Sequence, residues 1–233
     1  PTIFDSVLYQ ISKSQGRYAG EFVQPAELSS FICKLANLPV NAKVYNPFAG
    51  VASIAVFLEH YQEYIGQEID QSIVALGALR ILAYGKQMNT ILECKNSIEY
   101  WPKDDQRFDL IVSTPPFNLR LNNLDTNLNA NIRTAEQFFI QNGVKSLRQD
   151  GKLIAVLPQG FLFRSGQDKL LREQLINDDL IDTVISLPTG LLSYAGVNIV
   201  VLVLNKSKAY PNKVRFVNAE SFVKGQILRD RVL

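Results

Sequence analysis

Short apolar runs that are typical of buried strands alternate along this chain with longer segments of helical spacing. The strand-like runs are Lys43–Tyr45, Tyr64–Glu68, Thr90–Cys94, Phe108–Ser113, Lys152–Leu157, Ile181–Ser186, Val197–Leu204 and Lys213–Val217. The helical segments are Pro25–Ala36, Ala52–Tyr61, Ser72–Gly85, Thr134–Leu147 and Gln167–Ile176. Because parallel strands need a long crossover between them, this alternation predicts an α/β fold with an open, mostly parallel sheet covered by helices on both faces.

Local signals predict where several of these elements begin or end. Pro25 suits the first position of its helix, and Gly85 suits a helix stop. Asp150-Gly151 predicts a turn that leads into a buried strand. Residues 118–133 contain six asparagines and no strand pattern, so we expect a mobile loop there.

The 233 residues suit one domain that spans residues 1–233. The longest apolar stretch, Val197–Leu204, is far too short to cross a bilayer, and no signal peptide is visible. We therefore expect a cytoplasmic protein without a membrane partner. The first residue is Pro1 rather than Met, which points to a fragment of a longer protein.

Cysteine, histidine and charge exclude other classes of protein. Cys33 and Cys94 form no metal-binding pattern, and we expect both to be small core residues in a reducing compartment. A Ser–His–Asp hydrolase would have to use His60, which lies late in a predicted helix. No metal site is predicted. The net charge of +2 is weak for a protein that holds nucleic acid alone, so such a substrate would need another subunit.

Ligands of open α/β sheets bind beyond the carboxyl ends of the strands, so the turns that follow strands carry the functional information. The first such turn is Tyr45-Asn46-Pro47-Phe48-Ala49-Gly50-Val51-Ala52-Ser53. Its small residues allow a close backbone approach, and the helix that follows offers free N–H groups. It lacks the GxGxxG pattern of dinucleotide sites, and a plain tight turn with Gly50 at positive φ explains it equally well.

The second and third turns carry a carboxylate and an amide. Glu68 ends the second predicted strand and would accept hydrogen bonds from both hydroxyls of a ribose, at the usual distance of about 20 residues from the first turn. Asp70 is expected to cap the next helix. Asn96, in Lys95-Asn96-Ser97, would bind the edge of a purine, although an ordinary turn asparagine fits as well.

The fourth turn, Thr114-Pro115-Pro116-Phe117, is the most specific. It follows the strongly apolar run Phe108–Ser113. Two prolines stop the strand and fix the backbone, which leaves carbonyl groups outside the ladder. A rigid carbonyl, a hydroxyl and an aromatic ring together suit one planar group, while the alternative is a stiff loop that only terminates the strand.

This turn resembles the fourth motif of DNA amino-methyltransferases, Asn/Asp/Ser-Pro-Pro-Tyr/Phe. More closely, the chain resembles the modification subunit of type I restriction-modification systems, from about residue 16 to residue 206 and in family order. The further segments that carry the resemblance are Gly20-Glu21-Phe22-Val23-Gln24-Pro25, Val156-Leu157-Pro158-Gln159-Gly160 with Leu162-Phe163, and Ile185-Ser186-Leu187-Pro188-Thr189-Gly190-Leu191.

The resemblance implies a Rossmann-like S-adenosylmethionine-dependent methyltransferase fold, with an antiparallel strand at the far edge and residues 1–24 leading into the cofactor site. It implies an enzyme that transfers a methyl group from S-adenosyl-L-methionine to N6 of an adenine flipped out of double-stranded DNA. Its partners would be a specificity subunit and a restriction subunit.

The resemblance also implies the site residues. Thr114 and the Pro115 carbonyl would accept the amino hydrogens, and Phe117 would stack on the base beside Pro116. The cofactor would contact Phe22, Gln24, Asn46, Pro47, Phe48, Ala49, Gly50, Ser53, Glu68, Ile69, Asn96, Ser97, Thr114 and Pro116.

The chain also departs from the family pattern. Thr114 stands where Asn or Asp is usual, Asn46 where Asp is usual and Ala52 where Gly is usual, and the acidic residue that the family usually has near Asn96 is absent. Two alternatives therefore stay open. One is a catalytically degenerate homologue that binds cofactor or DNA as an assembly subunit. The other is a methyltransferase for cytosine N4, an RNA base or a protein amide.

Overall fold

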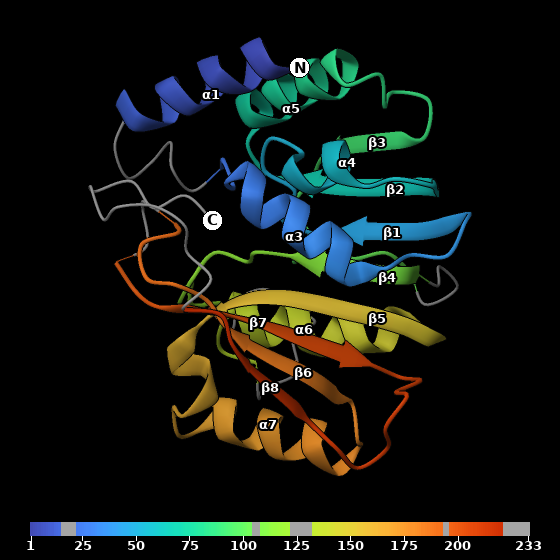
Figure 1. The fold of residues 1–233 in the computed structure, drawn as a ribbon, viewed down its shortest axis with the longest axis vertical. Coiled ribbons are helices and arrows are strands. Elements are labelled where there is room, and N and C mark those ends of the chain that lie inside the picture. Colours follow the sequence, from blue (N-terminus) through green and yellow to red (C-terminus); the bar gives the residue numbers. More distant parts are fainter. Residues whose placement is uncertain (15–21, 104–107, 122–131, 193–195, 221–233) are drawn as a thin grey trace.

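The computed structural model describes residues 1–14, 22–103, 108–121, 132–192 and 196–220 (Figure 1). In this part of the chain one sheet of eight strands has the order β3-β2-β1-β4-β5-β7-β6-β8. The strands are β1 Ala42–Asn46, β2 Tyr61–Glu68, β3 Thr90–Cys94, β4 Phe108–Ser113, β5 Leu147–Pro158, β6 Ile181–Ser186, β7 Ile199–Asn205 and β8 Arg215–Asn218. The strand predicted at Phe108–Ser113 and two others have the predicted bounds, and the rest differ mainly at their ends.

Strands β1 to β5 pair in parallel, as do β6 and β8, whereas β7 is antiparallel to both β5 and β6. The predicted mostly parallel sheet is therefore confirmed, and so is an antiparallel strand in its far half. That strand lies inside the sheet, because β6 and β8 pair beyond it. The parallel half carries the carboxyl ends where ligands of such sheets bind.

Helices cover both faces of the sheet. They are α1 Thr2–Ser14, α3 Ala26–Ala36, α4 Ser53–Phe57, α5 Gln71–Ala83, α6 Ala135–Ser146 and α7 Gln167–Asn177, with a short 3₁₀ helix η1 at Gln159–Leu162. Successive residues of a strand point to opposite faces. Thus Leu110 and Val112 of β4 pack with α3 and α4 on one face, and Ile111 packs with α6 and α7 on the other (Figure 1).

Both predicted ends of the helix α5 are confirmed, one by a capping side chain and the other by a glycine. The Asp70 carboxylate accepts hydrogen bonds from Ser72 N at 2.7 Å and Ile73 N at 3.3 Å, which confirms the predicted cap of α5. Gly85 has φ of +68° just after this helix, as expected for a stop. Pro25 was wrongly predicted at the first helical position, because its extended ψ of 140° makes it the N-cap residue.

The helix predicted over Ala52–Tyr61 is much shorter. α4 ends at Phe57, and β2 already begins at Tyr61. Between them His60 adopts φ of +59° and is exposed, so its predicted place in a helix is wrong. The apolar residues after Ala52 gave a helical pattern, but the last of them belong to the connection and to the next strand.

The turn predicted at Asp150-Gly151 is an irregularity within one strand. β5 runs unbroken from Leu147, and its register slips where residues 148–151 lie opposite the single residue Asp109 of β4. The Asp109 carboxylate bridges this slip, since it accepts hydrogen bonds from Lys43 N at 2.7 Å and Arg148 Nη1 at 2.9 Å. The turn signal was therefore real, but the ladder continues through it.

The prediction for the two cysteines is half correct. Cys33 is half-buried, and burial raises the pKa of its thiol to about 12. Cys94 is exposed, so its prediction as a core residue is wrong. It lies on β3, an outermost strand of the sheet, where one side is not covered by a neighbour.

Most of the predicted loop at 118–133 lies outside the described residues. Its described ends are anchored, because Arg120 forms an antiparallel bridge with Thr134. Leu121 and Ile132 pack together with Phe138 of α6.

Among the helices of the described residues, none is long and apolar enough to cross a membrane.

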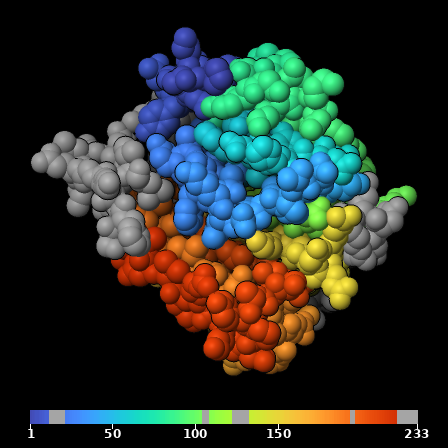
Figure 2. Space-filling model, turned by 45° about the vertical axis from the view of Figure 1, so that its right-hand side comes forward, coloured from blue at the N-terminus to red at the C-terminus, as the bar shows by residue number. Residues whose placement is uncertain are grey.

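The sequence patterns did not indicate α1, which lies beside α5 at one end of the molecule (Figure 2). A buried ion pair joins the two helices. The Asp5 carboxylate accepts hydrogen bonds from Arg80 Nε at 2.8 Å and Nη2 at 2.9 Å, and from Tyr84 Oη at 2.6 Å. The Arg80 side chain is only 3% exposed, so Asp5 balances a charge that water hardly reaches.

We expect Asp5→Ala to lower the free energy of unfolding by about 3 kcal/mol, because it leaves the buried Arg80 charge without its partner. Chemical denaturation followed by circular dichroism measures the loss. The control is Glu173→Ala, which removes the exposed pair of Lys169 and Glu173 on α7 and should cost less than about 0.5 kcal/mol. Equal losses in the two variants would show that Asp5 does not anchor α1.

Candidate functional site

A cavity of about 530 Å³ opens at the carboxyl ends of β1 to β4. The predicted site residues that line it are Phe22, Pro47, Phe48, Gly50, Glu68, Ile69, Asn96, Ser97, Thr114, Pro115, Pro116 and Phe117. The remaining ones, Gln24, Asn46, Ala49 and Ser53, line a smaller cavity of about 30 Å³. The two cavities share Phe22, Phe48, Gly50 and Thr114 as lining residues, so the structure gathers all the predicted residues in one region.

The turn after β1 is built around Gly50. Its φ is +53°, the positive value expected for a tight turn, which is the alternative interpretation left open above. A Cβ atom there would lie 2.6 Å from the Phe22 carbonyl oxygen, so only glycine fits. That same oxygen accepts a hydrogen bond from Val51 N at 3.2 Å. Ala52 also adopts a left-handed conformation, with φ of +57°, where the family pattern has Gly.

Two polar side chains of this turn form hydrogen bonds to other residues of the protein. The buried Asn46 Oδ1 accepts hydrogen bonds from Phe48 N at 3.2 Å and Ser113 Oγ at 2.7 Å, which links the ends of β1 and β4. Ser53 Oγ accepts one from Arg80 Nη1 at 2.9 Å. Through Arg80, this turn is therefore connected to Asp5 of α1.

Glu68 links the turns that follow β1 and β2. Its Oε2 accepts a hydrogen bond from Gly50 N at 3.1 Å, and its Oε1 accepts one from Asp70 N at 3.0 Å. Burial raises the pKa of this carboxyl above its usual value, although the backbone N–H groups partly offset the effect. Each carboxylate oxygen can accept more than one hydrogen bond, so a ligand in the cavity can still donate to Glu68.

The third turn forms hydrogen bonds within itself and to the first turn. Asn96 Oδ1 accepts from Ile98 N at 3.1 Å, and its Nδ2 donates to Glu99 Oε1 at 2.7 Å. These are the contacts of an ordinary turn asparagine, the alternative left open above. The buried Ser97 Oγ donates to the Pro47 carbonyl. Asn96 and Ser97 nevertheless both line the cavity.

Thr114 lies at the opening of the fourth turn, and its hydroxyl has a defined direction. Its Oγ1 donates to Gln24 Oε1 at 2.7 Å, and Gln24 Nε2 in turn contacts Ser29 Oγ at 3.0 Å. Ser29 Oγ donates to the Pro25 carbonyl at 3.0 Å, so the chain of donors ends on backbone. Because the Thr114 proton is used on Gln24, its oxygen lone pairs remain to accept from a ligand.

The rest of the fourth turn separates into buried and accessible parts. Pro115 is buried, Pro116 is exposed, and Phe117 is half-buried against the core cluster that includes Leu28 and Ile32 of α3. A ring fixed from one side in this way keeps its orientation. The turn therefore presents the expected elements for a planar group: an acceptor hydroxyl, a rigid backbone and an aromatic side chain.

Sequence reasoning missed part of the cavity wall, namely Gln67, Lys95, Ile98, Asn118, Leu119, Gly196 and Val197. The buried Gln67 accepts from Tyr45 Oη at 2.7 Å and donates to Glu93 Oε2 at 3.1 Å. Position beside Glu68 or Phe117 could have indicated Gln67 and Asn118. Gly196 and Val197 lie far away in the sequence, and no local signal pointed to them.

Comparisons with known sequences identify the family of this chain. The family model described as N-6 DNA Methylase matches residues 2–231. The methylase subunit of the type I restriction enzyme MpnII from Mycoplasma pneumoniae is 21% identical over 94% of this chain and 46% of its own length. The MjaVII methylase subunit from Methanocaldococcus jannaschii is 27% identical over 86% of this chain and 39% of its own length. The chain thus spans less than half of either relative.

Solved structures confirm the predicted methyltransferase fold. A type I restriction-modification methyltransferase subunit from Streptococcus thermophilus matches with a TM-score of 0.80 and 22% identity, over 91% of this chain and 50% of that one. A protein from Listeria monocytogenes described as a class I S-adenosylmethionine-dependent methyltransferase matches with a TM-score of 0.70 and 16% identity, over 85% and 66% of the two chains.

The Gly50 turn gives a test of the site's construction. Gly50→Ala should destabilise the fold by about 3 kcal/mol, because it combines left-handed strain with a clash against the Phe22 backbone. Gly85→Ala is the matched control, since Gly85 has a similar φ of +68° but no atom within 4 Å of an added Cβ. It should cost only about 1 kcal/mol.

Thermal or chemical unfolding of the two variants measures the difference, which isolates the clash from the strain. A Gly50→Ala variant as stable as Gly85→Ala would mean that the Phe22 segment is not held against this turn.

Proposed function

The chain belongs to the N-6 DNA methylase family, and we propose that it binds S-adenosylmethionine and methylates the N6 amino group of adenine in DNA. The observation that carries this proposal is the Thr114–Gln24 hydrogen bond, at 2.7 Å, in the wall of the cavity. This hydrogen bond orients the hydroxyl of Thr114, which departs from the family pattern, so that its oxygen can act as an acceptor. The identity of the target and of the cofactor both follow from the family.

The residues around Glu68 fit the nucleoside part of S-adenosylmethionine. Within the described residues, no cationic side chain pairs with this carboxylate, and its contacts are backbone N–H groups. It is thus available to accept hydrogen bonds from ribose hydroxyls. Ile69, which is 67% exposed, and Ile98 supply apolar surface for a purine ring. When bound, S-adenosylmethionine supplies the activated methyl group.

The fourth turn fits the target amino group. Such an amino group is conjugated to its ring and is a poor nucleophile. If it donates one hydrogen to Thr114 Oγ1 and the other to the Pro115 carbonyl, its nitrogen lone pair is directed out of this plane of acceptors. Phe117 holds the ring by stacking. Orientation and preorganised dipoles then lower the barrier, and the nitrogen loses one proton as the new N–C bond forms.

The proposed assembly is a type I restriction-modification system with a specificity subunit and a restriction subunit. One observation supports the need for partners. The net charge of +2 provides little general attraction for double-stranded DNA. In this proposal the partners hold the duplex, and this chain receives the flipped adenine.

The departure at Thr114 also supports a second candidate, a subunit that binds the cofactor without catalysis. The amino acceptor and the cofactor site use different residues, so the two functions are separable. Cofactor binding is common to both candidates, whereas methyl transfer belongs only to the enzyme.

Titration with S-adenosylmethionine by calorimetry is the first experiment, because it needs no partner subunit. We expect saturable binding by the wild type, and an affinity at least about 10-fold lower for Glu68→Gln, which replaces a charged acceptor. Wild-type affinity should also fall as the pH drops from neutral, since protonation removes acceptor capacity. Burial raises the pKa of Glu68, so this fall begins at a higher pH than for an ordinary glutamate.

The direction of the pH dependence distinguishes the loss of cofactor affinity from acid unfolding. A carboxyl whose pKa is raised in the folded state binds protons more tightly there, so acidification through that pKa favours the folded chain as far as Glu68 is concerned. Glu68→Gln should lack the pH-dependent fall. Equal affinity of both proteins at neutral pH would refute the ribose assignment.

Phe117→Leu tests the stacking assignment with little change in core volume. We expect S-adenosylmethionine affinity within about twofold of wild type but a loss of about 10- to 100-fold in kcat/KM for methyl transfer, from the stacking energy of one base. Transfer of labelled methyl groups to DNA measures it. Phe216→Leu, at a ring that is 76% exposed on β8, is the control and should remain as active as wild type. Full activity of Phe117→Leu would contradict the assignment.

A further inference from the structure

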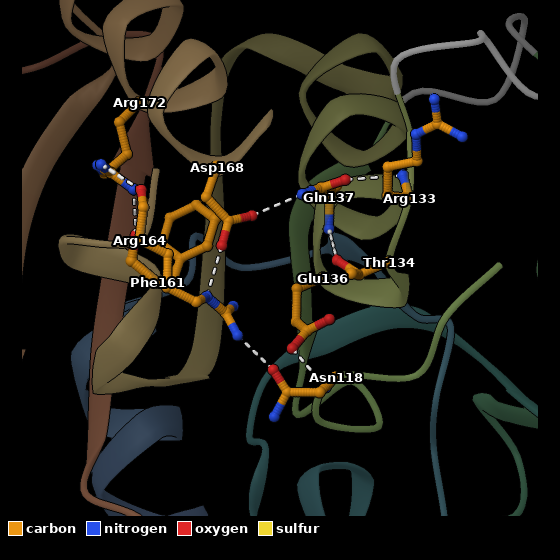
Figure 3. A network of polar contacts seen from close by, with 9 residues as sticks. All are labelled: Asn118, Arg133, Thr134, Glu136, Gln137, Phe161, Arg164, Asp168 and Arg172. Atoms are coloured by element: carbon orange, nitrogen blue, oxygen red, sulfur yellow. Dashed lines mark hydrogen bonds and ion pairs between the residues drawn. The ribbon is translucent and has the colours of Figure 1, made fainter. Parts of the chain in front are cut away.

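A polar network ends on Asn118, the residue that follows the fourth turn in the sequence (Figure 3). The Asn118 backbone N–H donates to Glu136 Oε1 at 2.7 Å, and Arg164 Nη1 donates to Asn118 Oδ1. Arg164 Nε is held by Asp168 Oδ2 at 2.7 Å. The other Asp168 oxygen accepts from Gln137 Nε2 at 2.6 Å. The network therefore connects Asn118 to α6 and α7.

The two groups that touch Asn118 differ in burial, since Glu136 is fully buried whereas the Arg164 side chain is 33% exposed. Glu136 is 0% exposed, and its Oε2 has no hydrogen-bond partner among the described residues. Arg164 Nη2 is likewise buried and has none there. Buried charges of this kind bind the neutral groups that they do contact strongly. Asn118 is thus fixed at two points, its backbone N–H and its side-chain oxygen.

These contacts decide which way the Asn118 amide faces. A guanidinium has only donors, so the amide must turn its oxygen towards Arg164. The two N–H donors of Nδ2 then face away from the network, as Figure 3 shows. No hydrogen bond from Nδ2 is formed to the described residues, and Asn118 lines the same cavity as Thr114 and Phe117. An oriented donor therefore stands beside the proposed acceptors of the amino group.

We propose that Asn118 contributes to base specificity, by donating from Nδ2 to the ring nitrogen next to the amino-bearing carbon of the flipped base, which selects adenine or cytosine against guanine and thymine. This inference rests on the proposed function, because it assumes a base in the cavity. In adenine that atom is N1, an acceptor. In guanine and thymine the corresponding ring nitrogen carries a hydrogen, which would face the Asn118 donors. The Watson–Crick edge of a flipped base is thus read by acceptors at Thr114 and Pro115 and by a donor at Asn118.

Arg164 acts as a positioning residue in this proposal, since it contacts Asn118 and not the base. Its own place is set twice, by Asp168 on its side chain and by Arg172 Nη2, which donates to the Arg164 carbonyl at 2.9 Å. Arg172 Nη1 also donates to the Phe161 carbonyl at 2.5 Å, which holds η1 against α7. The direction of the Asn118 amide therefore depends on helices outside the cavity.

The test measures affinity for a base that is already unpaired, so it depends on no partner subunit. The probe is a short single-stranded oligonucleotide with one adenine among thymines, and its twin carries 1-deazaadenine, which has a C–H in place of N1. Fluorescence anisotropy is measured on chain saturated with S-adenosylhomocysteine. We expect wild type to bind the adenine probe about 5- to 10-fold tighter than the twin, the usual contribution of one hydrogen bond.

Asn118→Asp removes both donors at nearly constant shape and keeps the acceptor for Arg164, so the ratio of the two affinities should fall to about one. Asn212→Asp is the matched control. Asn212 has φ of +58°, against +57° for Asn118, and its N–H also donates to a carboxylate, Asp179 Oδ2, at 2.8 Å. It adds the same charge and should keep the wild-type ratio. Arg164→Gln should give an intermediate ratio.

If wild type binds the two probes with equal affinity and still binds S-adenosylhomocysteine, the role of Asn118 is overturned but the proposed function is not. A loss of affinity with 7-deazaadenine instead of 1-deazaadenine would also overturn it, since N7 would then be the atom recognised. A folded wild-type chain that binds neither S-adenosylhomocysteine nor the oligonucleotides would contradict the proposed function and this inference together.

Discussion

The close approach of the Phe22 backbone to Gly50 is the constraint on which the rest of the site depends. Without a Cβ at Gly50, the Phe22 carbonyl reaches Val51 N at 3.2 Å and fixes the incoming segment against the turn after β1. Gln24, only two residues further on, then lies where it accepts from Thr114. Glu68 secures the same turn from the opposite side through Gly50 N. One glycine thereby brings together three segments that are distant in the sequence.

The sequence predicted the sheet and the meeting of the four turns that form the candidate site, because both depend on local patterns. Each apolar run became a strand, and the residues of all four turns met around one region because parallel strands end at the same edge. Helix ends were less predictable, as His60 shows, since a helical pattern does not mark where a short helix gives way to the next strand. α1 was missed because an ion pair with distant Arg80 helps to hold it.

The contacts within the site were not predictable from the motifs either. Nothing in the sequence pairs Gln24 with Thr114, which are 90 positions apart. This pairing changes how the departure at Thr114 is understood. A hydroxyl is both donor and acceptor, so alone it would not define an acceptor as a carboxylate does. Gln24 takes its proton and removes that ambiguity. The substitution therefore alters the shape of the acceptor more than its hydrogen-bonding role.

Charged side chains contact residues of both halves of the cavity wall. On the cofactor side, Asp5 and Arg80 reach the first turn through Ser53, and on the target side, Glu136 and Arg164 reach Asn118. Buried ion pairs rarely stabilise a fold more than apolar packing of the same volume would. Their consequence here is directional, since an ion or its hydrogen-bonded neighbour accepts only certain orientations of the group it contacts. Apolar contacts could give the cavity its volume, but they could not decide whether a donor or an acceptor faces a bound base.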